Sequence, residues 1–237
     1  MDFFVSIDQK KHPVEVNRKS MKRVRLKVFP SGAIKLSVPL DTSDEWISGF
    51  LASKEGWIAE KSALFQTTKA VEKEEHICSG TATRILGRQL TILVLSSAGK
   101  RIEQQDDMLV VFTSETEQDK IDRQYRSWWH RKAKSQYTQT MARLYPIVGK
   151  HGITRPDIIV KQMQTLWGSC GKNNGRINLN YYLLKAPQPC IEYVILHELT
   201  HFLYPHHNED FYTFMTVHMP DWQERKRLLD YETVLGI

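Results

Sequence analysis

Polar and apolar residues alternate in two short runs near the start of the chain. The runs are Arg23–Val28 and Ile34–Val38, and Pro30-Ser31-Gly32 lies between them. Strict alternation on both sides of a turn signal predicts a β-hairpin with one apolar face and one basic face. After the hairpin, Thr42 or Ser43 can cap a helix that extends to about residue 66. The apolar positions of that helix are Trp46, Ile47, Phe50, Leu51, Trp57 and Ile58.

Strand-like segments continue to residue 113. Alternating or apolar runs occur at Thr83–Leu86, Gln89–Leu95, Arg101–Gln104 and Met108–Thr113, and Gly87 and Gly99 mark turns between them. The amino-terminal half is therefore expected to be a small sheet with one helix.

Helical spacing dominates the second half of the chain. Ser114–Glu117 has the pattern of a capping box, which predicts the start of a long helix. Asp157–Lys161 and Arg176–Tyr182 are expected to be strands, and Leu166–Gly171 between them a turn. Two more helices are expected after Asn208 and near Pro220. The long helix carries an apolar stripe that we expect to be buried, formed by Tyr125, Trp129, Ala133, Tyr137 and Met141.

These patterns predict an α+β fold in two parts. The first is a small β-rich amino-terminal domain over residues 1–113 that has one helix and carries the basic hairpin. The second is a mostly helical domain over residues 114–237 with a short sheet.

A helix that starts at Pro187 and Pro189 and stops before Pro205 carries the candidate chemistry. Glu192 would complement the positive end of this helix. An ideal helix places His197 and His201 together, outside a broad apolar arc, with Glu198 at the border of the arc. We therefore expect a mostly buried helix with one polar strip open to a cleft. The residues of the arc are Ile191, Ile195, Leu196, Leu199, Phe202 and Leu203, with Val194 at its far edge.

The spacing of His197, Glu198 and His201 is that of a catalytic metal site. Two histidines four residues apart can bind one ion, and the glutamate between them can take a proton from bound water. Pro205 ends the helix and lets the chain turn back, so that His207 is expected to be the third ligand, with His206 as the alternative. Neutral imidazoles and an open fourth position favour one zinc ion.

Charge and composition add three expectations. Residues 1–40 carry nine Lys or Arg and three Asp or Glu, whereas the remaining residues balance at 24 and 24, so the net charge of +6 comes from the first forty residues. On the hairpin, Arg23, Arg25 and Lys27 are a candidate face for phosphate or nucleic acid, or else charges that protect an exposed sheet edge. The sequence shows no secretory signal and no apolar run that could span a bilayer, and its three cysteines have no CxxC spacing. We therefore expect a cytoplasmic protein with reduced thiols and no contact with a membrane.

Several segments resemble the YgjP-like family of metal-dependent hydrolases, which is related to the SprT-like zinc metallopeptidases. The resemblance implies a zincin-like catalytic half, with a short sheet beside the HExxH helix, metal bound by His197, His201 and His207, and Glu198 as general base. Leu166 departs from the family pattern, which usually has arginine before the tryptophan. The matching segments are Trp167–Cys170, Ile177–Asn180, Tyr193–His201, His207 with Phe211, and Met219–Trp222.

The sequence therefore predicts a zinc-dependent hydrolase, with peptide-bond hydrolysis of a peptide or protein substrate as the expected reaction. One alternative is a metal-dependent nucleoside-triphosphate pyrophosphatase, and another is a nucleic-acid-associated peptidase that docks through the basic hairpin. Zinc peptidases generally use a further donor to the developing oxyanion. The candidates for that donor, or for other contacts in the cleft, are Arg176, Asn180, Tyr182, Tyr204 and His206.

Overall fold

The computed structural model describes residues 3–7, 10–21, 24–29, 32–68, 76–164 and 166–234. The chain divides near residue 73 into two units that each have their own hydrophobic core. The expected boundary, between residues 113 and 114, lies well after this division, since residues 76–113 pack with the carboxy-terminal unit. The α+β fold class is confirmed, with small sheets in both units.

The first unit is a four-stranded sheet followed by two helices. Leu26 lies opposite Leu36 and Lys27 opposite Lys35, so the expected hairpin forms with one apolar and one polar face. The first two strands were not predicted, although Phe3, Val5 and Ile7 alternate and are buried. The sheet has the order β1-β2-β4-β3, built from β1 (Phe3–Ile7), β2 (Lys10–Lys19), β3 (Arg25–Val28) and β4 (Ile34–Pro39).

The expected first helix is interrupted once. It consists of α1 (Asp44–Ser53) and α2 (Glu55–Thr68), which are separated at Lys54. Ser43 caps α1 by accepting a hydrogen bond from the backbone N–H of Trp46 at 3.2 Å. Of the expected apolar positions, Ile47, Leu51 and Ile58 are buried in the core of this unit.

The second unit begins with a sheet that packs on a long helix. All four strands expected between residues 83 and 113 are present, and Gly87 turns the first pair with a φ of 83°. Leu90, Ile92 and Leu109 share one core with Tyr125 and Trp129 of the helix, which explains why the sheet belongs to this unit. The sheet has the order β5-β6-β8-β7, built from β5 (Ala82–Ile85), β6 (Arg88–Ser96), β7 (Arg101–Gln105) and β8 (Met108–Thr113).

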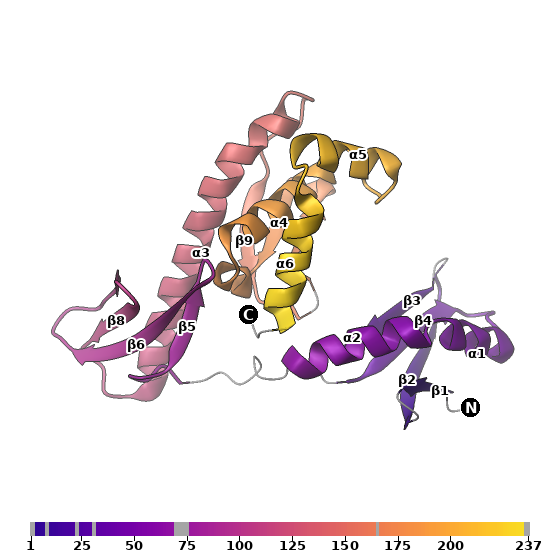
Figure 1. The fold of residues 1–237 in the computed structure, drawn as a ribbon, viewed down its shortest axis with the longest axis horizontal. Helices are drawn as coiled ribbons and strands as arrows, with labels where there is room; N and C mark the ends of the chain where they lie inside the picture. Colours follow the sequence, from indigo (N-terminus) through magenta and orange to yellow (C-terminus); the bar gives the residue numbers. More distant parts are fainter. Residues whose placement is uncertain are drawn as a thin grey trace. The chain divides into compact units, whose positions relative to one another are not determined.

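The long helix, α3 (Gln118–Gly149), runs from this sheet to the remaining helices (Figure 1). The expected apolar stripe of the helix is buried along its length. The expected capping box does not form, because the helix starts at Gln118, and Glu117 precedes it without a side-chain cap. Trp129 donates from Nε1 to the backbone carbonyl of Tyr181 at 3.0 Å. This hydrogen bond joins α3 to the 3₁₀ turn Tyr181–Lys185.

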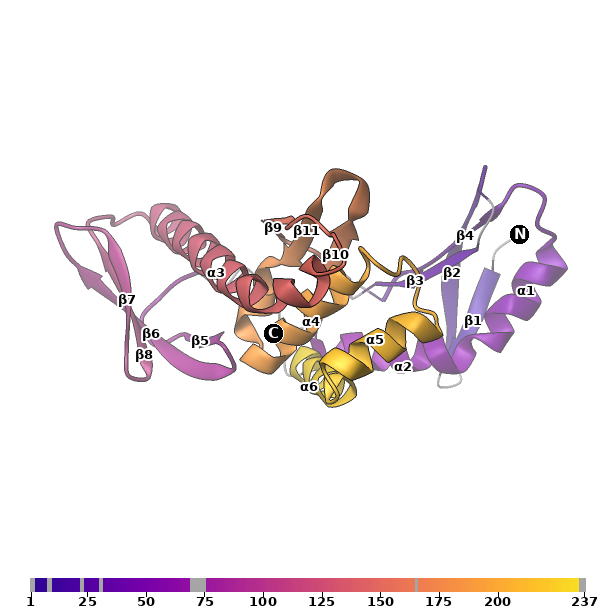
Figure 2. The ribbon, with the colours of Figure 1, turned by 90° about the horizontal axis from the view of Figure 1, so that it is seen from above.

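A second, three-stranded sheet lies beside the HExxH helix (Figure 2). It has the order β10-β11-β9, built from β9 (Asp157–Lys161), β10 (Gly168–Gly171) and β11 (Arg176–Asn180). The prediction of a turn at Leu166–Gly171 is wrong for its last four residues, because Gly168–Gly171 pairs antiparallel with β11. The strand expected at Arg176–Tyr182 ends at Asn180, whose side chain caps the 3₁₀ turn Tyr181–Lys185.

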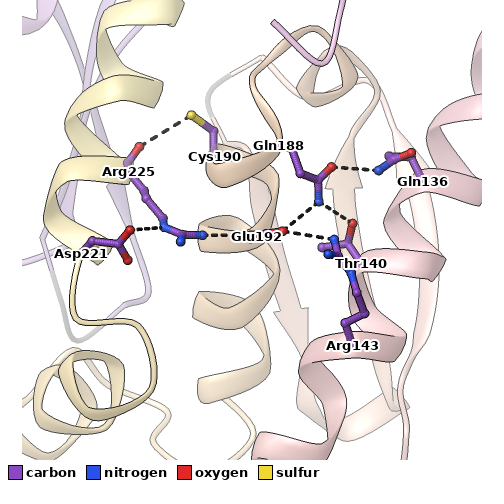
Figure 3. Close-up of polar contacts among 8 residues, drawn as sticks. All are labelled: Gln136, Thr140, Arg143, Gln188, Cys190, Glu192, Asp221 and Arg225. Atoms are coloured by element: carbon purple, nitrogen blue, oxygen red, sulfur yellow. Dashed lines mark hydrogen bonds and ion pairs between the residues drawn. The ribbon is translucent and has the colours of Figure 1, made fainter.

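Three helices complete the second unit: α4 (Gln188–Thr200), α5 (Glu209–His218) and α6 (Trp222–Val234). Glu192 lies beyond the first turn of α4, where it pairs with Arg143 of α3 at 3.1 Å and Arg225 of α6 at 2.7 Å (Figure 3). Gln188 extends this network to Thr140 at 3.0 Å. Polar contacts therefore hold α4 between α3 and α6, in place of the helix-end role expected for Glu192.

Candidate metal centre

Helix α4 and the turn after it present His197, Glu198 and His201. The expected apolar arc packs into the core, although Leu203 at its end is only half-buried. The helix ends at Thr200, and His201 follows as its C-cap residue, still in the right-handed helical region. Both histidines therefore keep the helical spacing that places their rings on one side, with ring centroids 4.9 Å apart.

The chain then returns and places His207 beside the first histidine. His207 Nε2 lies 3.0 Å from His197 Nε2, and the ligand atoms of His197, His201 and His207 all lie within 4.8 Å of one another. Two nitrogens bound to one tetrahedral zinc ion are about 3.3 Å apart, so this spacing fits an ion between them. His206 is exposed and does not belong to this group, which favours His207 over His206 as the third ligand.

Phe211 forms the floor under the three imidazoles. Its ring centroid lies 5.0 Å from that of His197, 4.8 Å from that of His201 and 4.7 Å from that of His207. Phe211 is fully buried. The side chain of Asn208 caps α5, the helix expected after it, by accepting a hydrogen bond from the backbone N–H of Phe211 at 3.1 Å. One apolar ring therefore supports all three candidate ligands.

Further aromatic rings line His197 and His207. The ring of Tyr193 meets that of His197 edge-on at 5.7 Å, and Tyr212 stacks on His207 at 6.1 Å. Trp222 stacks between these tyrosines, 6.4 Å from Tyr193 and 5.4 Å from Tyr212. The rings restrict how far the two imidazoles can turn.

One contact sets the tautomer of His201. Its Nδ1 lies 3.1 Å from the backbone carbonyl oxygen of Tyr204. A carbonyl can only accept, so Nδ1 carries the hydrogen and Nε2 keeps a lone pair. The turn after α4 thereby leaves Nε2 of His201 available as a metal ligand.

The environment holds the three imidazoles neutral. Burial, followed by the nearby His201, His207 and Lys226, lowers the pKa of His197 to about 3. Burial also lowers the pKa of His201 and that of His207, and in both cases the neighbouring His206 adds to the effect. Neutral imidazole is the form that binds metal, because protonation and metal binding compete for the same lone pair.

Glu198 is buried beside these rings. Its side chain belongs to the buried polar residues, with 6% of the residue exposed, and burial raises its pKa to about 8. The backbone N–H of Cys170 in β10 donates to the carboxylate and opposes part of that rise. A divalent cation next to the carboxylate would favour its ionised form, so metal binding would lower this pKa.

Strand β10 approaches Glu198 more closely than a side chain would allow. A Cβ on Gly168 would lie 2.7 Å from both Cγ and Oε1 of Glu198. No role for the side-chain-free position of Gly168 was predicted, because a glycine before a small polar residue is a common pattern that does not by itself identify a functional position. The contact explains why glycine is needed at the point where the strand meets the glutamate.

Replacing Gly168 by alanine is expected to displace the Glu198 carboxylate. A shift of this size at a reacting group lowers kcat by about a hundredfold, whereas the three imidazoles remain in place and keep their metal affinity. Peptidase kinetics and metal content measured on the same preparation would show both effects. Gly99→Ala is the matched control, because a Cβ there meets nothing within 4 Å. Wild-type activity in Gly168→Ala would contradict the close contact.

Among the expected cleft residues, Asn180 has a structural role. It is buried, and its side-chain amide donates to the carbonyls of Met163 at 2.7 Å and Leu166 at 2.9 Å. Its side-chain oxygen accepts from the N–H of Tyr182 at 3.1 Å. These contacts support a role in capping a turn, in place of the contact in the cleft for which Asn180 was a candidate. Leu166, the departure from the family pattern, is 55% exposed and contributes its carbonyl to this arrangement.

The other cleft candidates lie in different surroundings. Arg176 is exposed at the start of β11. Tyr182 contacts the ring of Tyr181 at 5.1 Å, and Lys185 lies over its ring. The backbone carbonyl of Tyr204 contacts Nδ1 of His201, while the ring of Tyr204 packs on Phe214 with centroids 5.7 Å apart. His206 is close enough to His201 and His207 to contribute to lowering the pKa of each.

The candidate phosphate-binding face lies in the first unit. Arg23 falls outside the described residues, and Arg25 and Lys27 are exposed on β3. Lys35 on the same face pairs with Glu15 at 2.6 Å. In the part of the chain that the structure describes, no helix is both long and apolar enough to cross a membrane.

Three clustered imidazoles beside a buried glutamate, on a helix that packs against a short sheet, are typical of metal-dependent hydrolases. The family model for the YgjP-like metallopeptidase domain matches residues 22–232. The chain belongs to this YgjP-like family, and the protein is a metallopeptidase that acts on peptide substrates.

Similarity to solved structures covers part of the chain. The crystal structure of the metallopeptidase zymogen jannalysin of Methanocaldococcus jannaschii is similar over 39% of this chain and 95% of its own, with 20% identity and a TM-score of 0.34. The comparison with curated proteins found no match.

Proposed function

We propose that this metallopeptidase binds one zinc ion through His197, His201 and His207 and uses Glu198 as the general base. The observation that carries the proposal is the convergence of three ligand nitrogens within 4.8 Å of one another, next to a buried carboxylate. Neutral imidazoles favour zinc over magnesium, which prefers oxygen ligands. Three protein ligands leave a fourth position for water and substrate.

The chemistry divides between the ion and the protein. When bound, zinc lowers the pKa of a water molecule and polarises the carbonyl of the substrate. Glu198 accepts the proton of the attacking water on a carboxylate oxygen and then transfers it to the nitrogen of the leaving amine. The N–H of Cys170 holds the carboxylate in place, and the close contact with Gly168 prevents it from moving toward β10.

Removing the metal tests the proposal directly. The purified protein is expected to contain about one zinc ion per chain, to lose peptide hydrolysis after treatment with a chelator, and to regain it when zinc is added back in equal amount. Hydrolysis of nucleoside triphosphates is measured in parallel. Full peptidase activity in metal-free protein would refute the proposal, and release of pyrophosphate without peptide cleavage would favour the pyrophosphatase.

A further inference from the structure

A basic groove lies in the second unit, apart from the histidine cluster. It has a volume of about 770 Å³ and lies between β7 with the turn before it, the segment after β8, and the amino-terminal half of α3. Figure 1 shows this end of α3 beside the sheet β5–β8, whereas His197 and His201 belong to α4 and the turn that follows it. One carboxylate, that of Glu115, lines the groove. Five cationic residues line it as well, namely Lys100, Arg101, Lys120, Arg123 and Arg131.

The cations of the groove are not equally neutralised. Lys100 and Lys120 both pair with Glu115, and Lys120 also reaches Glu117 at 2.8 Å. Arg101 pairs with Glu103 at 2.9 Å.

Arg123 and Arg131 differ from these three cations. They show no carboxylate partner among the residues that the structure describes, and Arg131 donates only to Ser127 at 2.6 Å. Two exposed guanidinium groups are therefore available to bind an anion, and the planar guanidinium suits a carboxylate or a phosphate.

The spacing of the two arginines suits an extended peptide. Arg123 and Arg131 are eight residues apart on one helix, and Lys120, Ser127 and Trp128 lie on the same side of it. Eight residues of helix rise about 12 Å. Four residues of an extended chain cover about the same length, and an even number places both side chains on one face.

A second feature of the groove favours a ligand with N–H groups. Gln124 lines the groove, and its Nε2 donates to the carbonyl of Phe112 at 2.8 Å. Its Oε1 is buried and has no hydrogen-bond partner among the described residues. A buried acceptor without a donor is costly, and a small turn of the side chain would let it accept from a peptide N–H. The phosphodiester backbone of a nucleic acid has no such donor.

We propose that this groove binds an acidic segment of the polypeptide substrate, with carboxylates about four residues apart facing Arg123 and Arg131. The groove would act as a second contact with the substrate, remote from the bond that is cleaved. The proposal takes from the family assignment only that the substrate is a polypeptide. It does not depend on which residues bind the metal or act as the base.

Binding of a labelled peptide tests the proposal without any need for activity. The full-length Glu198→Gln protein is titrated, at low salt, against an extended peptide with two glutamates about four residues apart, and against the same peptide with glutamines. Arg123→Ala/Arg131→Ala is expected to weaken binding of the glutamate peptide by about tenfold or more, because two charge-assisted contacts are lost. Added salt should reduce the difference. Fluorescence anisotropy measures each affinity.

Two variants separate the groove from general effects of charge or folding. Lys132→Ala/Arg155→Ala removes two exposed cations outside the groove and is expected to leave the affinity within about twofold. Glu115→Gln releases Lys100 and Lys120 and is expected to tighten binding, a gain that a damaged fold would not produce. Equal losses in the two double variants would overturn the proposal. The proposal would also be overturned if a single-stranded oligonucleotide bound more tightly than the glutamate peptide and this binding depended on Arg123 and Arg131. That result would assign the groove to nucleic acid.

Discussion

Replacement of Glu198 by glutamine is expected to lower kcat by about a thousandfold, since the amide cannot accept a proton from water. The exchange retains the size of the side chain and leaves the three imidazoles unchanged, so about one zinc ion per chain should remain bound. Steady-state peptide hydrolysis and metal analysis of the same sample measure the two effects. Glu224→Gln, which neutralises an exposed carboxylate on α6, is the matched control and should behave like the wild type.

The pH dependence of the wild type follows from the same residue. The base must be ionised, so kcat/KM should fall as the pH drops through the pKa of Glu198. Burial raises that pKa to about 8 in the metal-free protein, and the charge of the ion lowers it. The decrease of kcat/KM on the acid side should therefore lie below pH 8. The residual kcat/KM of the Glu198→Gln variant should not show this decrease. Wild-type activity in the Glu198→Gln variant would exclude Glu198 as the base.

His207→Ala is expected to weaken zinc binding by more than about a hundredfold, because loss of a direct ligand costs more than loss of a residue that only supports one. The neighbouring substitution His206→Ala is the matched control, because His206 lies outside the cluster, and it should change the affinity little. Competition with a coloured chelator measures both dissociation constants. The opposite order of the two effects would assign His206 as the third ligand.

Local sequence patterns were sufficient for most of the elements. Alternation identified the hairpin β3–β4 and the strands β5–β8, and the spacing of Tyr125, Trp129 and Tyr137 identified the buried face of α3. The first two strands could have been found in the same way, because Phe3, Val5 and Ile7 alternate. The capping-box pattern, in contrast, was a false signal: α3 begins only at Gln118, and Glu117 directly before it makes no side-chain cap.

The boundary between the two units could not be read from composition. It depends on which core the strands β5–β8 join, and Leu90, Ile92 and Leu109 belong to the same core as the buried face of α3. Similarly, Gly168–Gly171 has the composition of a turn. It becomes a strand because β11 supplies hydrogen-bond partners along its length.

The sequence by itself determined the relation of His197, Glu198 and His201, because the 3.6-residue period of one helix sets which side chains share a face. Only the tertiary structure decided the rest of the centre. The return of the chain after Pro205 brings His207 Nε2 to 3.0 Å from His197 Nε2, while α5 places Phe211 beneath all three rings. Glu198 is held by β10, which is distant along the chain. A helical period reaches over a few residues, whereas these contacts depend on how whole elements pack.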